Sequence, residues 1–201
     1  MVVRPVGDRA VLVELDGNPA AHALASLVRS GFGDVVVDVV AGHSTVLITW
    51  AGAALDPRVL AAVEAFSFDA ASGPVVGRSV TLEVTYDGPD LDVVAEHTGL
   101  SADEVVRRHR ASEYRVGFVG FAPGFAYLLG GDPALHVPRR SEPRERVPAG
   151  AVALAGEYCA VYPAASPGGW QLIGRTDATL FDPADADRPA LLEPGDTVRF
   201  A

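Results

Sequence analysis

The chain has 201 residues, 49% hydrophobic and 21% charged, which allows one large or two small globular domains and excludes a disordered chain. Its formal net charge of -10 argues against non-specific binding to nucleic acid or to an anionic membrane face. No apolar run approaches the roughly 20 residues that span a bilayer, and the N-terminus lacks a secretory signal, so we expect a cytoplasmic protein.

The first part of the chain predicts an α+β sandwich whose elements follow the order ββαββα. We expect two strands within residues 2–15, a helix over 19–29, a hairpin of 35–40 and 45–50, and a helix over 56–66. Asp56 followed by Pro57 is typical of a helix start, because an N-cap residue precedes a first-turn proline. The helix side chains expected to face the core are Leu24, Leu27, Val28, Val59, Leu60 and Val63.

The stretch AASGPVVG, residues 70–77, consists of small residues with Gly and Pro between two complete units. Such a composition is typical of a linker. It predicts a domain of residues 1–76 and a second domain of residues 77–201.

The second domain is expected to begin with a strand over residues 78–86 and to continue with two helices. The helices begin at Asp90 and at Ser101, and Gly99 ends the first of them. From residue 112 onwards, short apolar runs alternate with Gly and Pro turns, which favours a β-barrel or a sandwich.

A cluster of arginines is the main candidate binding feature: Arg139, Arg140, Arg144 and Arg146. All 16 basic residues are arginine, so the chain offers no Schiff-base or P-loop lysine. Guanidinium groups bind carboxylate or phosphate in bidentate fashion, which makes the cluster a candidate anion site. Surface ion pairs with Glu142 and Glu145 explain the pattern equally well.

A second candidate feature is the segment from Ser166 to Gly169, which is predicted to be a turn. Its backbone N–H groups could form an anion nest, with Trp170 as a stacking face. A plain hairpin turn is the alternative. Arg175 places one more cation at the end of the following apolar strand.

The remaining reactive residue types give little sign of chemistry. The five histidines lack metal-ligand spacing, so no metal is expected, and no Ser-His-Asp arrangement can be recognised. His109 is expected to be a cation near the last carbonyls of its helix. The single cysteine, Cys159, lies in an apolar segment and is expected to be a buried hydrophobe rather than a nucleophile.

Several longer motifs spread over most of the chain are more specific than any of these patterns. They are YDGPDL (86–91), GFAPGFAYL (120–128), PRRSEPRERVPAG (138–150), VYP (161–163), SPGGWQLIGRT (166–176), LFDP (180–183) and PGDTVRF (194–200). At these positions the sequence resembles the family that includes the B subunit of 5-oxoprolinase, the kinase-inhibitor protein KipI and allophanate hydrolase subunit 1, whose domains also form part of carboxyltransferases.

The resemblance implies an N-terminal α+β domain followed by a cyclophilin-like β-barrel. It also implies the B subunit of an ATP-dependent 5-oxoprolinase, which acts with the C and A subunits to cleave 5-oxoproline to glutamate and is inactive alone. ATP would be a co-substrate, with Mg²⁺ in the assembled complex, and no cofactor would be attached covalently. The alternatives are an inhibitor of a sensor histidine kinase and a carboxyltransferase-like component that acts on urea or a related amide.

Opening a stable lactam requires activation, and charge that develops on its oxygen calls for preorganised cations and amide donors. The motif positions that could supply catalytic cations are Arg139, Arg144 and Arg175. Those expected to bind substrate or ATP are Pro123, Phe125, Tyr127, Tyr162, Ser166, Gly168, Gly169 and Trp170. Phe118, Phe121 and Phe125 are either a partner interface or core.

The sequence departs from the family pattern at two places. Ala151 stands where relatives have a serine, so a hydroxyl role at that position is excluded. The segment YLLGGDPAL differs from the usual YLGGL near Leu129, which we expect to shift a loop without changing the fold.

Overall fold

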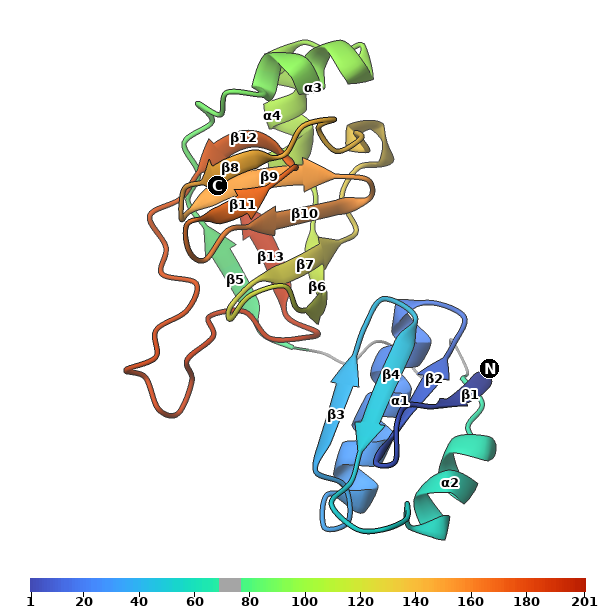
Figure 1. Ribbon diagram of the computed structural model, residues 1–201. Coiled ribbons are helices and arrows are strands. Elements are labelled where there is room, and N and C mark those ends of the chain that lie inside the picture. The colour runs from blue at the N-terminus through green and yellow to red at the C-terminus, as the bar shows by residue number, and fades with distance from the viewer. Residues whose placement is uncertain (69–76) are drawn as a thin grey trace. The chain divides into compact units, whose positions relative to one another are not determined.

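The structure of the protein is a computed structural model that describes residues 1–68 and 77–201 (Figure 1). The chain divides into two compact units, Met1–Val76 and Gly77–Ala201. The predicted linker, residues 70–77, lies outside the described residues except at its last position. No helix among the described residues is both long and apolar enough to cross a membrane.

The first unit is a four-stranded antiparallel sheet with two helices. Its elements are β1 (Val2–Pro5), β2 (Ala10–Glu14), α1 (Asn18–Phe32), β3 (Asp38–Ala41), β4 (Thr45–Thr49) and α2 (Pro57–Glu64). The strands stand in the order β1-β2-β4-β3, and α1 packs against β3 and β4 (Figure 1). Alternating apolar residues of the strands therefore meet the apolar stripe of α1 in one core.

The two helices of this unit show where the sequence pattern was right and where it was wrong. The side chain of Asp56 accepts a hydrogen bond from the Arg58 N–H at 2.8 Å, which confirms the predicted cap of α2. Leu27 and Leu60 are 39% and 38% exposed, so their predicted burial was wrong. The helices bury a narrow stripe of i, i+4 positions, and both leucines lie beside it.

The second unit is built on a seven-stranded sheet that curls on itself. Its strand order is β12-β9-β10-β7-β6-β13-β5, and a bridge between Thr85 and Arg175 joins the two edges. The strands are β5 (Ser79–Leu82), β6 (Tyr114–Val119), β7 (Ala126–Leu129), β9 (Ala151–Ala155), β10 (Tyr158–Val161), β12 (Gln171–Arg175) and β13 (Thr197–Phe200). Two further strands, β8 (Arg144–Val147) and β11 (Ser166–Gly168), form a separate antiparallel pair.

Two predictions for these strands need correction. The strand expected over residues 78–86 ends at Leu82, which pairs with Phe200, the last residue of β13. The segment predicted as a turn at Ser166–Gly169 is strand β11, which pairs with the arginine-rich β8. A Gly- and Pro-rich segment forms a strand here because a partner that is distant in sequence supplies its hydrogen bonds.

Helices α3 (Leu91–Thr98) and α4 (Ala102–Ala111) lie at one end of the curled sheet (Figure 1). Gly99 ends α3 in the left-handed conformation at φ 69°, and the Ser101 hydroxyl accepts from the Glu104 N–H at 3.2 Å. Both predicted helix boundaries are confirmed.

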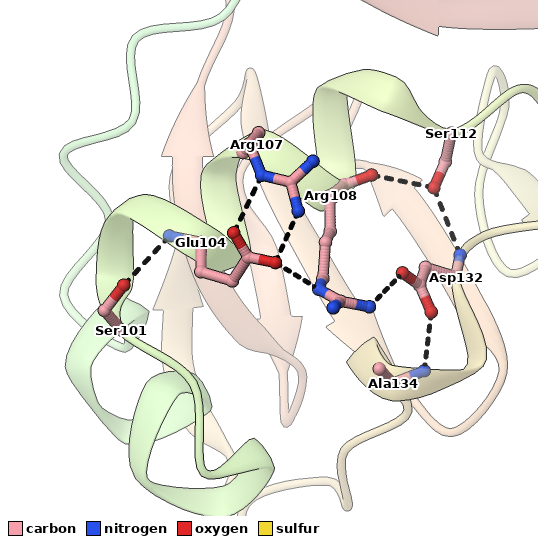
Figure 2. A network of polar contacts seen from close by, with 7 residues as sticks. All are labelled: Ser101, Glu104, Arg107, Arg108, Ser112, Asp132 and Ala134. Atoms are coloured by element: carbon pink, nitrogen blue, oxygen red, sulfur yellow. Dashed lines mark hydrogen bonds and ion pairs between the residues drawn. The ribbon is translucent and has the colours of Figure 1, made fainter.

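A polar network ties α4 to the short 3₁₀ helix η2 (Pro133–Leu135) (Figure 2). Glu104 accepts from Arg107 and Arg108 at 2.7 Å each, and Arg108 also donates to Asp132 at 2.8 Å. Asp132 in turn caps η2 through the Ala134 N–H at 2.9 Å. These contacts fix the loop after β7 to the helix, and the arginines lower the pKa of Glu104 to about 2.

His109 does not cap the end of α4 as predicted, because its side chain is completely buried. Its Nδ1 lies 2.8 Å from the Tyr86 hydroxyl and its Nε2 lies 3.3 Å from the sulfur of Cys159. Its ring also packs on Phe200 with centroids 4.4 Å apart. Burial lowers the pKa of His109 to about 3, so the ring is neutral at physiological pH. The burial of Cys159 is confirmed.

We expect His109 to make the second unit sensitive to mild acid. The folded protein keeps this ring neutral down to about pH 3, whereas the unfolded chain binds a proton below about pH 6.5. Stability from this group is thus complete above pH 6.5 and falls as the pH drops, by about 2 kcal/mol between pH 6.5 and pH 5. Urea denaturation of wild type and His109→Gln at both pH values measures it, with the exposed His136→Gln as control. A His109→Gln protein that loses as much stability as wild type contradicts the prediction.

Candidate functional site

An aromatic cavity of about 100 Å³ opens on the second unit. We refer to it as the aromatic pocket. The residues that line it are Phe121, Phe125, Tyr127, Arg139, Tyr162, Pro167, Gly168, Gly169 and Trp170. They come from the loop between β6 and β7, from β7, from the arginine-rich segment (residues 138–147), from the end of β10 and from β11 and the bend after it.

Phe125 forms the centre of the pocket and is 2% exposed. Its ring meets those of Tyr127, Tyr162 and Trp170 edge to face, with centroids 5.1, 5.2 and 5.7 Å apart. Such contacts fix aromatic side chains in one arrangement. The pocket therefore has rigid apolar walls before any ligand arrives.

Phe121 stands at the rim and is 63% exposed, although its ring touches that of Phe125. It also has a φ of 67°, in the left-handed region that an aromatic residue rarely adopts. Strain of this kind costs on the order of 1–3 kcal/mol and is concentrated at functional sites. Phe125 therefore belongs to the core and Phe121 to the surface. The phenylalanines that were predicted to be either a partner interface or core do not share one environment.

Gly168 closes one side of the pocket against Tyr162. A Cβ atom added at Gly168 would lie 2.3 Å from the Tyr162 hydroxyl, so a side chain has no room there. Burial raises the pKa of Tyr162, and its hydroxyl therefore stays protonated as a potential hydrogen-bond donor at neutral pH.

Arg139 supplies the positive charge of the pocket. Its guanidinium carbon lies 5.7 Å from the centroid of the Trp170 ring, in cation–π contact. Within residues 1–68 and 77–201, no group forms a hydrogen bond or ion pair with this guanidinium. Its donors are therefore available to an anionic ligand.

The two neighbouring arginines have a different environment. Arg140 and Arg144 donate to the same oxygen of Asp90, at 3.1 and 2.7 Å. Arg140 also donates to the backbone carbonyl of Glu142 at 3.3 Å, but among the described residues neither arginine forms the expected ion pair with a glutamate carboxylate. Asp90 is 2% exposed, and its other oxygen accepts from the Leu172 N–H at 2.7 Å. Asp90 therefore anchors the arginine-rich segment to β12.

The structure brings most of the predicted site residues together and leaves four outside the aromatic pocket. Pro123, Ser166, Arg144 and Arg175 do not line it. Arg175 instead forms an exposed ion pair with Asp87 at 2.9 Å. Phe121 and Pro167 line the pocket but were not predicted to bind a ligand, although both lie inside the motifs GFAPGFAYL and SPGGWQLIGRT.

Within residues 1–68 and 77–201, no group of three or more His, Cys, Asp or Glu side chains could hold a metal ion.

The second unit has a curled mixed sheet, two helices and an aromatic pocket lined by residues of the sequence motifs. This combination is found in a known class of domain. The sequence matches the family described as "Carboxyltransferase domain, subdomain C and D" over residues 1–192, and the chain belongs to that family.

The chain is similar to several named proteins. The chain is 56% identical over 126 residues to the B subunit of 5-oxoprolinase from Escherichia coli O157:H7, covering 61% of this chain and 57% of that protein. It is 47% identical over 126 residues to the 5-oxoprolinase B subunit of Bacillus subtilis (strain 168), covering 61% of this chain and 52% of that protein. The crystal structure of TTHA0988 superposes with a TM-score of 0.83 at 35% identity, over 96% of this chain and 39% of that one.

The chain thus spans a little over half the length of the curated relatives it matches. The similarity shows that the chain is related to these longer proteins.

Proposed function

We propose that this protein is the B subunit of an ATP-dependent 5-oxoprolinase. The observation that carries the proposal is the 56% identity to a protein of that name. The pocket supports it, because Arg139 places an unpaired guanidinium beside rigid aromatic walls. Such a site suits a small flat anion, and 5-oxoproline is a five-membered lactam that carries a carboxylate.

The reaction needs activation because a lactam is as stable as an amide. In the proposed sequence, the lactam oxygen accepts the γ-phosphoryl group of ATP and ADP leaves. A water molecule then adds to the carbonyl carbon, and the ring nitrogen leaves with a proton, which gives an acyl phosphate. A second water molecule hydrolyses this to glutamate and phosphate. Arg139 would stabilise negative charge on the transferred group or on the substrate carboxylate.

The rest of the proposal concerns the assembly. We expect the second unit to be a cyclophilin-like half-barrel that works only with the C and A subunits, in the cytoplasm where ATP is available. Mg²⁺ would enter with the nucleotide phosphates. The exposed Phe121 at the pocket rim would contact one of these partners, because large exposed aromatics are enriched at interfaces.

The test is 5-oxoproline-dependent formation of ADP and glutamate, measured for this chain alone, with the C subunit, and with both the C and A subunits. We expect turnover only in the full mixture. Arg139→Gln should lower it by about a hundredfold or more, the usual effect of removing one preorganised donor. Arg146→Gln, an exposed arginine of the same cluster, should leave it within about twofold.

Complex formation measured by gel filtration separates a chemical effect of Arg139→Gln from lost assembly. If an assembled complex of all three chains produces no glutamate from 5-oxoproline, the proposed substrate is wrong. If Arg139→Gln turns over like wild type, the activity stands but Arg139 has no part in it.

A further inference from the structure

A second cavity, of about 350 Å³, shares a lining residue with the aromatic pocket. Its polar lining consists of His97, Arg139, Arg140, Ser141 and Gln171, and we refer to it as the polar cavity. Arg139 lines both cavities. His97 comes from the last turn of α3, Gln171 from β12, and the other three from the arginine-rich segment.

Positive charge exceeds negative charge at this cavity. The carboxylate of Asp90 is shared between Arg140 and Arg144, so it can compensate only one of these two guanidinium charges. Arg139 has no ion pair within residues 1–68 and 77–201. Several guanidinium N–H groups therefore remain for a ligand, together with the hydroxyl of Ser141 and the ring of His97. These groups favour an oxyanion.

Gln171 favours a ligand that carries a hydrogen-bond donor, which an oxyanion without a proton lacks. The residue is 3% exposed, and its Nε2 donates to the Pro138 carbonyl at 3.1 Å. Its Oε1 is buried and has no hydrogen-bond partner among the described residues. An unsatisfied buried acceptor costs about 1–3 kcal/mol, so a ligand with a donor gains by reaching it. The same reasoning disfavours a ligand that presents only acceptors.

We propose that the polar cavity binds a small oxyanion that carries its own hydrogen-bond donor, held by Arg139, Arg140 and Ser141 and selected by Gln171. Two kinds of compound meet this description. Hydrogen phosphate has a P–OH group beside its charged oxygens, and a lactam acid has an N–H next to its carboxylate. The phosphate alternative is independent of the oxoprolinase function, whereas the lactam alternative rests on it, because 5-oxoproline is the proposed substrate. Binding is measured with this chain alone and without turnover, so a failure of binding can be distinguished from a failure of the proposed reaction.

The test is calorimetric titration of the full chain with inorganic phosphate and with sulfate at about pH 8. Both ions are then dianions of similar size, but only phosphate keeps a proton. In a parallel titration, 5-oxoproline is compared with its lactone analogue, in which a ring oxygen replaces the N–H. At least one donor-bearing compound should bind about tenfold more tightly than its counterpart without a donor. The pair that shows this preference identifies the kind of ligand.

The variants separate the two parts of the proposal. Arg139→Gln should weaken both members of the preferred pair by about tenfold, whereas Arg146→Gln should weaken neither. Gln171→Met should reduce the preference to within about twofold while the donor-free anion still binds. Ser141→Ala, at an exposed position, should weaken both members equally and tests the site should Gln171→Met fail to fold.

The proposal is overturned if no compound binds, if neither pair shows a preference, or if Arg139→Gln binds like wild type. A Gln171→Met protein that is folded and keeps the full preference would remove Gln171 as the selecting group. Circular dichroism of each variant establishes that the fold is retained.

Discussion

Replacing Asp90 with alanine is expected to lower the free energy of unfolding of the second unit by about 3–5 kcal/mol. The side chain is buried and accepts hydrogen bonds from Arg140, Arg144 and the Leu172 N–H. Its removal leaves two guanidinium groups without their carboxylate and a buried N–H without its acceptor. One Nη of Arg144 already has no hydrogen-bond partner among the described residues. We therefore expect no other acceptor to take the place of the Asp90 carboxylate at this arginine.

Urea denaturation followed by the fluorescence of Trp170 measures this effect in the second unit. A Trp50→Phe background removes the tryptophan of the first unit, so the signal reports on one unit only. Asp92→Ala is the matched control, because Asp92 is exposed in the first turn of the same helix and should cost less than about 1 kcal/mol. An Asp90→Ala protein as stable as Asp92→Ala would show that the carboxylate does not anchor the arginine-rich segment.

Asp90 also illustrates which features the sequence could reveal. It was predicted correctly as the residue at which α3 starts, but its side chain makes no capping hydrogen bond to that helix. The caps at Asp56 and Ser101 and the stop at Gly99 could be predicted because each depends on residues within one turn. The partnership of Asp90 with Arg144 spans 54 positions, and no local pattern indicates which of many carboxylates will approach an arginine.

The candidate site was predictable to a similar extent. Phe125, Tyr162 and Trp170 were proposed together because each lies in a specific motif, and the structure places their rings in one pocket. The sequence could not indicate which arginine remains unpaired. That distinction depends on the position of Asp90, which leaves Arg139 free and holds Arg144. His109 was misjudged for the same reason, since burial depends on which strands close over a helix.

The second large loss of stability is expected on substitution of Gly150, which lies where β9 begins and where β10 and β12 end. Its N–H donates to the Tyr162 carbonyl at 2.8 Å, and its carbonyl accepts from the Thr176 N–H at 2.9 Å. Its φ is 78°, and an added Cβ would lie 2.2 Å from the Thr176 carbonyl oxygen. Gly150→Ala must therefore strain the backbone and push β12 away from β9. We expect it to lower the free energy of unfolding by about 2–5 kcal/mol, from left-handed strain and overpacking combined.

Gly156→Ala separates these two causes. Gly156 has a φ of 57° but no atom within 4 Å of an added Cβ, so only the conformational strain of about 1–2 kcal/mol applies. Because Gly150 is hydrogen-bonded to Tyr162, its substitution should also displace a wall of the aromatic pocket, which Gly156→Ala should leave unchanged. Urea denaturation in the same Trp50→Phe background compares their stabilities. Equal losses of stability would mean that β12 yields freely at Thr176, and that the close approach at Gly150 contributes nothing to the packing of the sheet.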